Sequence, residues 1–230
     1  TTSSCGGALN IATKILNLKK GDNIICQANA FWVTINALLE KKIKVIPIDV
    51  DSKDLNIDPK KIENKINKKT KAIFVVHFAG APVNMIEIKK IGKKYNLPII
   101  EDCAHACGSK YKNKFVGSNS DMACFSFSTH KNISTLGEGG MFVTNNKKYA
   151  ELAEKLRTNF PWGIKKKRKS RFIGKFKKPN TSEFMKFGDA FDLDFKSLKE
   201  IGSTYRMTTV QAAVGMEQLK KLKYLNNLRK

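Results

Sequence analysis

Short apolar segments alternate with amphipathic segments along most of this chain. Apolar runs that are typical of buried strands span 23–27, 45–50, 71–78, 97–101, 123–128 and 141–144. Patterns with helical spacing lie between them and predict helices over 9–16, 31–41, about 58–67, 84–95 and 147–157. This alternation predicts an α/β fold of three layers, with a mostly parallel sheet and helices on both faces.

Polar residues mark the expected starts of several helices. Asp58 followed by Pro59 is typical of an N-cap with proline in the first helical position. Capping-box spacing, in which a polar residue precedes Glu or Gln by three positions, occurs twice. The two boxes are Asn84 with Glu87 and Thr208 with Gln211. The second box opens an amphipathic pattern that continues to Leu228.

The pattern is interrupted over residues 158–201. Apolar periodicity fades there, and Gly, Pro and Lys are frequent, so we expect an irregular basic insertion or loop. The chain then divides into a large domain over 1–157, this insertion, and a segment over 202–230 that leads toward a small C-terminal domain absent from the chain. The sequence starts without Met and ends inside a helical pattern, and we therefore expect a fragment of a longer protein.

The net charge of +23 would suit a nucleic-acid-binding module. Lysine is spread along the whole chain, however, together with abundant Asn and Ile, as a biased genome composition would produce. We therefore do not expect a nucleic-acid partner, and a basic α/β binding module stays an alternative that rests on charge alone.

The five cysteines are odd in number and no secretory signal precedes them, which favours a reducing cytoplasm over a disulfide framework. Cys103, His105 and Cys107 are closely spaced, but a zinc site usually needs a fourth ligand from a second cluster. We expect buried thiols and no metal. No apolar run approaches the roughly 20 residues that span a bilayer, so we expect no membrane segment.

Residues with complementary chemistry follow two successive strand patterns. Asp102 ends one pattern, and Lys131 follows the next by three residues. Ligands of parallel sheets bind beyond the carboxyl ends of the strands, a rule that also draws attention to Phe31 and His77. A lysine amine can form a Schiff base and move protons, and a carboxylate can keep a pyridine nitrogen protonated. Pyridoxal phosphate (PLP) needs such a pair, although a strand-end aspartate is also commonly an N-cap.

The local sequence around this pair is more specific than its spacing. Three segments stand out: 101–106 (EDCAHA), 125–132 (FSFSTHKN) and 137–140 (GEGG). Further segments are 3–9, 31–36, 49–51, 56–59, 77–80, 205–208 and 211–213. In order and spacing, the set resembles the DegT/DnrJ-type family of PLP-dependent sugar aminotransferases. The resemblance covers nearly the whole chain except about 158–200.

The resemblance implies the large domain of the type I PLP-dependent transferase fold. It implies that Lys131 holds PLP as a Schiff base, that Asp102 pairs with the pyridine nitrogen, and that Phe31 stacks on the ring. His105 stands where the family has Gln or His near the phenolic oxygen of the ring. Phe31 and His105 would also be compatible with ordinary core positions.

A phosphate site is implied as well. Ser126 takes the place of a phosphate-binding hydroxyl, and Gly6 and Gly7 open the first helix, where free N–H groups and the helix dipole favour a phosphate. Many relatives carry Thr or Ser near Gly6, so a side-chain contact is missing there. Thr204 replaces a longer family Asn that reaches the phosphate of a partner subunit, which puts that contact in doubt.

The implied function is transfer of an amino group from an amino acid, with glutamate expected, to a keto-sugar that is linked to a nucleotide. A homodimer is implied. The alternative is a non-catalytic or regulatory PLP-binding protein of the same fold, because Gly6 and Thr204 depart from the family pattern. Three interpretations stay open for the basic stretch 165–178: a solvated loop, a contact for the diphosphate of the substrate, or a nucleic-acid contact.

Overall fold

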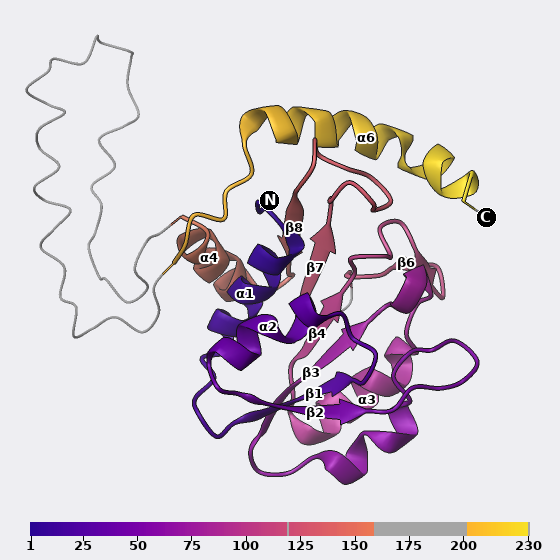
Figure 1. The fold of residues 1–230 in the computed structure, drawn as a ribbon. Helices are drawn as coiled ribbons and strands as arrows, with labels where there is room; N and C mark the ends of the chain where they lie inside the picture. Colours follow the sequence, from indigo (N-terminus) through magenta and orange to yellow (C-terminus); the bar gives the residue numbers. More distant parts are fainter. Residues whose placement is uncertain (119, 159–201, 230) are drawn as a thin grey trace, which may run out of the picture.

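A computed structural model describes residues 1–118, 120–158 and 202–229. The expected basic insertion, with the stretch 165–178, lies outside the described residues. The core of the molecule is a six-stranded sheet with the order β2-β1-β3-β4-β7-β8 (Figure 1). Its strands are β1 (Asn23–Gln27), β2 (Lys44–Ile48), β3 (Thr70–Val76), β4 (Ile99–Asp102), β7 (Met122–Ser126) and β8 (Gly140–Val143).

All neighbouring strands of this sheet are parallel except β7 and β8, which are antiparallel. The prediction of a mostly parallel sheet is confirmed. Strands β4 and β7 lie next to each other, with Asp102 opposite Cys124. A short separate hairpin, β5 (Lys110–Tyr111) and β6 (Lys114–Phe115), occupies part of the connection between them.

Helices cover both faces of the sheet, as expected. One face packs against α1 (Cys5–Ile15), α2 (Trp32–Glu40) and α4 (Lys147–Leu156); the other packs against α3 (Met85–Tyr95). Successive residues of β3 point to opposite faces. Phe74 belongs to the first apolar core, and its neighbours Ile73 and Val75 belong to the second. All three side chains are 0% exposed.

The prediction of an α-helix over 58–67 is wrong. The structure forms two 3₁₀ turns there, η1 (Pro59–Lys61) and η2 (Glu63–Lys65). Asp58 does cap the first turn, since its side chain accepts from the N–H of Lys60 at 3.0 Å. The segment is too short for a cooperative α-helix, and the asparagine at its end favours a turn. The Asn67 side chain accepts from the N–H of Lys69 at 2.9 Å and closes the segment.

Helix α1 begins at Cys5, four residues before the expected start at Leu9. Ser4 is the N-cap, and its hydroxyl accepts from the N–H of Gly7 at 3.0 Å. Glycine has a poor helix propensity, but close packing explains it at position 7. A Cβ atom on Gly7 would lie 3.0 Å from the ring of Tyr205.

Helix α6 (Thr209–Asn227) crosses over the carboxyl end of β7 (Figure 1). The capping box of Thr208 and Gln211 is confirmed, because each side chain bonds to the backbone N–H of the other. The underside of the helix packs on buried Phe127 and Ile133. A further 3₁₀ turn, η3 (Phe78–Gly80), follows β3. Within the described ranges, no helix combines the length and apolar character that crossing a membrane requires.

Candidate active site

The structure brings Asp102 and Lys131 to the same end of the sheet. Asp102 is the last residue of β4 and is 4% exposed. Lys131 lies in the turn after β7, partly buried, and its N–H donates to the carbonyl of Ser128 at 3.0 Å. Both charges act on His105. Burial lowers the pKa of His105, the positive charge of Lys131 lowers it further, and the Asp102 carboxylate opposes the shift.

The carboxylate of Asp102 is held on both oxygens. The hydroxyl of Thr34 donates to Oδ2 at 2.7 Å, and the N–H of Ala104 donates to Oδ1 at 3.0 Å. A carboxylate has about four acceptor sites, so two stay available for a further donor such as a protonated ring nitrogen. Asp102 therefore fits the role of pyridine partner. The sequence interpretation missed Thr34, whose only signal is its place in the first turn of a helix that starts at a strand end.

Phe31 is the N-cap of α2 and is 60% exposed. Its neighbour Trp32 is 61% exposed, and the centroids of the two rings are 5.6 Å apart. The alternative of a core aromatic at this position is therefore wrong. An exposed aromatic pair beside the carboxyl ends of the strands is available to cover a flat ring, which is the place that the resemblance gives to Phe31.

The first turn of α1 offers backbone donors for an anion. The first N–H groups of a helix have no partner within the helix. Here the Ser4 hydroxyl takes the N–H of Gly7, so Cys5 and Gly6 carry the donors that stay open for a phosphate. Gly7 acts instead at the contact with Tyr205.

Ser126 lies beside this turn. It is the last residue of β7, is 5% exposed, and pairs with Gly140 of β8. A Cβ atom on Gly140 would lie 2.4 Å from the backbone of Ser4, so the two segments are in close contact. The Ser126 hydroxyl accepts from the N–H of Ser128 at 3.4 Å and keeps its own hydrogen for another acceptor. The structure thus brings Ser126 and the α1 terminus together, as a phosphate site requires.

Helix α6 supports the turn that carries Lys131. Gln211 donates to the carbonyl of Glu138 at 2.8 Å, and Arg229 donates to the carbonyl of Asn132 at 2.9 Å. The helix also approaches closely at Gly215, where a Cβ atom would lie 2.8 Å from Thr135.

Thr204 lies in the segment that leads into α6. It is exposed and forms an isolated antiparallel bridge with Thr158, at the end of α4. Its expected contact with the phosphate of a partner subunit stays a prediction.

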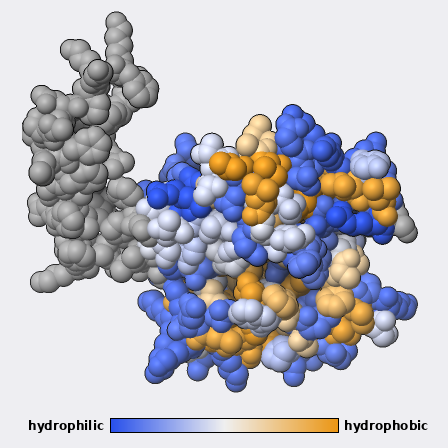
Figure 2. Space-filling view, turned by 45° about the horizontal axis from the view of Figure 1, so that its top comes forward, coloured by the Kyte–Doolittle hydropathy of each residue, from blue (hydrophilic) through white to orange (hydrophobic). Residues whose placement is uncertain are grey.

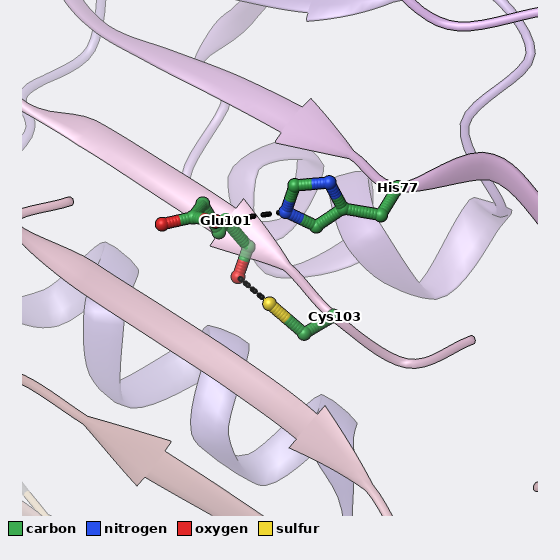
Figure 3. A group of neighbouring side chains, drawn as sticks. All are labelled: His77, Glu101 and Cys103. Atoms are coloured by element: carbon green, nitrogen blue, oxygen red, sulfur yellow. Dashed lines mark hydrogen bonds and ion pairs between the residues drawn. The ribbon is translucent and has the colours of Figure 1, made fainter. Parts of the chain in front are cut away.

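A second polar group is formed by His77, Glu101 and Cys103 (Figure 3), of which the strand-end rule had drawn attention only to His77. His77 Nδ1 accepts from the N–H of Val83 at 3.0 Å, so the ring hydrogen is on Nε2, which donates to Glu101 Oε2 at 2.8 Å. The N–H of Gly117 donates to the same oxygen at 2.9 Å. The ligand-type atoms of His77, Glu101 and Cys103 lie within 4.8 Å of one another. A protonated Nε2 cannot bind a metal, so we interpret the group as a buried hydrogen-bond network.

The five cysteines are free and buried, which confirms the expectation of buried thiols. Burial raises the pKa of Cys26 to about 12 and the pKa of Cys107 to about 11, so both thiols stay protonated near neutral pH.

The comparisons with known proteins agree with this geometry. The model of the DegT/DnrJ/EryC1/StrS aminotransferase family matches residues 1–230. The UDP-4-amino-4,6-dideoxy-N-acetyl-beta-L-altrosamine transaminase of Campylobacter jejuni is 39% identical over 223 residues, which are 96% of this chain and 51% of that protein. Helicobacter pylori PseC, an aminotransferase involved in the biosynthesis of pseudoaminic acid, has a TM-score of 0.77 and 31% identity over 97% of this chain and 53% of that one.

A further solved structure, NtdA of Bacillus subtilis with the bound cofactor PMP, has a TM-score of 0.76 and 28% identity over 97% of this chain and 44% of that one. The chain spans about half the length of the relatives that it matches. The family match over every residue and the fold lead to one conclusion: the chain belongs to the DegT/DnrJ/EryC1/StrS family of PLP-dependent aminotransferases.

Proposed function

We propose that the intact protein is a transaminase that holds PLP on Lys131 as a Schiff base and transfers an amino group from glutamate to a nucleotide-linked keto-sugar. One observation carries the proposal: Asp102, with both oxygens fixed by hydrogen bonds, ends the strand next to the one that leads into Lys131. A buried, oriented carboxylate beside an amine is the pair that PLP chemistry requires.

When bound, PLP would supply an electron sink for the substrate's α-carbon. Lys131 would attach the cofactor and then move the proton at that carbon. Asp102 would accept the N–H of the ring nitrogen on its open acceptor sites. Phe31, exposed at the start of α2, would cover one face of the ring.

The phosphate would lie between Ser126 and the first turn of α1. The N–H groups of Cys5 and Gly6, together with the positive end of the helix dipole, favour a dianion there. His105 would lie near the phenolic oxygen. Because its pKa is lowered, His105 is mostly neutral at pH 7 and would donate or accept a hydrogen bond without adding charge.

The substrate class comes from the relatives. The Campylobacter jejuni relative is named for a UDP-linked amino sugar, and PseC is described as acting in pseudoaminic acid biosynthesis. The UDP in the first name supports a nucleotide-linked sugar as the acceptor that we propose. The free, buried thiols support a reducing compartment, so we place the protein in the cytoplasm.

We also propose a homodimer. Apolar side chains are exposed on α6, at the start of α2 and in the turn after β7, and Figure 2 shows hydrophobic areas interspersed with strongly hydrophilic residues. Members more than half exposed are Phe31, Trp32, Leu136, Val210, Met216, Leu219, Tyr224 and Leu228. Exposed apolar side chains of this kind support a contact with a second subunit, which would cover them.

The proposal is tested by the first half-reaction of the intact protein. Loaded with PLP, it should absorb at roughly 410–430 nm, and glutamate should convert that band to the pyridoxamine form. The Lys131→Ala variant should show neither, and Lys147→Ala, which removes an exposed lysine on α4, should behave like the wild type. If PLP binds but no amino acid changes the band, the regulatory alternative replaces the transaminase.

A further inference from the structure

The hydroxyl of Thr34 donates a hydrogen bond to the carboxylate of Asp102. The two residues are 68 positions apart, the oxygen–oxygen distance is 2.7 Å, and both side chains are nearly fully buried. A separation near 2.7 Å is typical of a hydroxyl that donates to an ionised carboxylate, a bond roughly twice as strong as a neutral one. Burial strengthens it further, since the local dielectric is low.

A threonine in a helix commonly bonds back to the carbonyl four residues earlier. Thr13 of α1 does so, with its hydroxyl 3.0 Å from the carbonyl oxygen of Leu9. Thr34 lies in the first turn of α2, where the preceding residues are not yet helical, and its hydroxyl is directed to Asp102 instead. The stiff β-branched side chain keeps the hydroxyl in that direction.

The first turn of α2 touches each part of the proposed cofactor site. Phe31 caps it and is exposed beside the strand ends. A Cβ atom on Gly6, at the proposed phosphate turn, would lie 3.2 Å from Val33. Thr34 completes the turn, and its N–H donates to the carbonyl of Phe31 at 2.9 Å. The turn therefore joins the proposed ring, phosphate and ring-nitrogen contacts in one rigid unit.

We infer that Thr34 is a positioning residue, whose hydroxyl fixes the orientation of the Asp102 carboxylate toward the ring nitrogen of the cofactor. The inference rests on the proposed function. Ala104 supplies the other hydrogen bond through its backbone N–H, a donor that most residues provide, so the side-chain control of this carboxylate falls to Thr34.

The test uses two matched pairs in the intact protein. The first pair is the wild type and Thr34→Val, and the second pair is Thr34→Ser and Thr34→Ala. In each pair, one side chain has the hydroxyl and the other, of similar size, lacks it. Thr13→Val is the control, because it removes the hydroxyl of another buried helical threonine. The measurements are the Kd for PLP and the NMR shift of PLP labelled with ¹⁵N in the ring, which reports whether the ring nitrogen is protonated.

We expect Thr34→Val and Thr34→Ala to weaken PLP binding by about tenfold relative to their partners. The ¹⁵N shift should move toward the unprotonated value in both, while Thr34→Ser and Thr13→Val keep the wild-type shift. If Thr34→Val fails to fold, the Ser and Ala pair decides.

Equal Kd values and equal ¹⁵N shifts within the pairs would overturn the role of Thr34 and leave the proposed function standing. Failure of the wild type to take up PLP would overturn it together with the proposed function. The two failures are distinguishable, because the wild-type sample reports the second before any variant is compared.

Discussion

Asn132 and Asn226 lie 94 positions apart in the sequence, and the side-chain amide of Asn132 donates to the side-chain carbonyl of Asn226 at 2.9 Å. The amide of Asn226 donates in turn to the backbone carbonyl of Cys107 at 2.9 Å. One side chain of α6 therefore ties the turn that carries Lys131 to the loop that carries His105. The helix acts as a brace across the ends of β4 and β7.

Removing this brace should destabilise the site. We expect Asn226→Ala to lower the free energy of unfolding by about 1–3 kcal/mol, because it leaves two partly buried polar groups without their partner. Urea denaturation followed by fluorescence measures the change. Asn227→Ala, on the exposed side of the same turn, is the control and should have little effect. Identical unfolding midpoints for both variants would show that α6 does not brace the loops.

The His77–Glu101 pair should make stability depend on pH. Burial raises the pKa of Glu101, but hydrogen bonds from His77, from Ser120 and from the N–H of Gly117 outweigh it and leave the pKa below its ordinary value of 4.5. A depressed carboxyl pKa gives stability that is complete above 4.5 and is lost as the pH falls below it.

We therefore expect Glu101→Gln to cost about 1–3 kcal/mol of unfolding free energy at pH 7 and less as the pH falls below 4.5. Urea unfolding at several pH values measures the difference. Glu87→Gln, at an exposed glutamate of α3, should stay within about 0.5 kcal/mol of the wild type at neutral pH. A cost for Glu101→Gln that does not change with pH would contradict the assignment of an ionised, hydrogen-bonded carboxylate.

His105 should report the charges of its neighbours. Its pKa is lowered from 6.5, first by burial and next by the positive charge of Lys131, while Asp102 raises it. In the protein without cofactor, we expect Lys131→Met to move the NMR titration midpoint of His105 upward, toward 6.5, and Asp102→Asn to move it further down. If neither variant moves the midpoint, the three side chains do not share one site.

The proposed phosphate contact of Ser126 predicts a loss of cofactor affinity. We expect Ser126→Ala to raise the Kd for PLP by about tenfold, since one hydrogen bond to a charged group is lost. Ser128→Ala, two residues farther along the chain, is the matched control and should bind PLP like the wild type. Pyridoxal, which lacks the phosphate, should bind Ser126→Ala and the wild type equally; a preference for the wild type would place Ser126 elsewhere than at the phosphate.

The sequence predicted the parts of this architecture that depend on local patterns. The buried strands were visible as apolar runs, and the rule that parallel strands end at one edge was enough to bring Asp102 and Lys131 together. The capping box at Thr208 fixed the start of α6 to the residue. Family resemblance then supplied roles that spacing alone left open.

Contacts between distant segments could not be predicted in this way. The bonds of Thr34 to Asp102 and of Asn226 to Cys107 join residues that no periodic pattern relates. The 3₁₀ turns over 59–65 depend on a balance of weak local propensities that a helical pattern does not resolve. Which N–H groups of the first turn of α1 stay without a partner depends on Ser4, because its hydroxyl accepts from the N–H of Gly7.

The central claim is that Lys131 is the amine that holds the cofactor. The direct measurement is borohydride reduction of the intact, PLP-loaded protein, followed by proteolysis and mass spectrometry. We predict a single phosphopyridoxyl group on the peptide that contains Lys131, and none after Lys131→Ala. A stable adduct on another lysine, or an adduct that persists in Lys131→Ala at the wild-type level, would contradict the account.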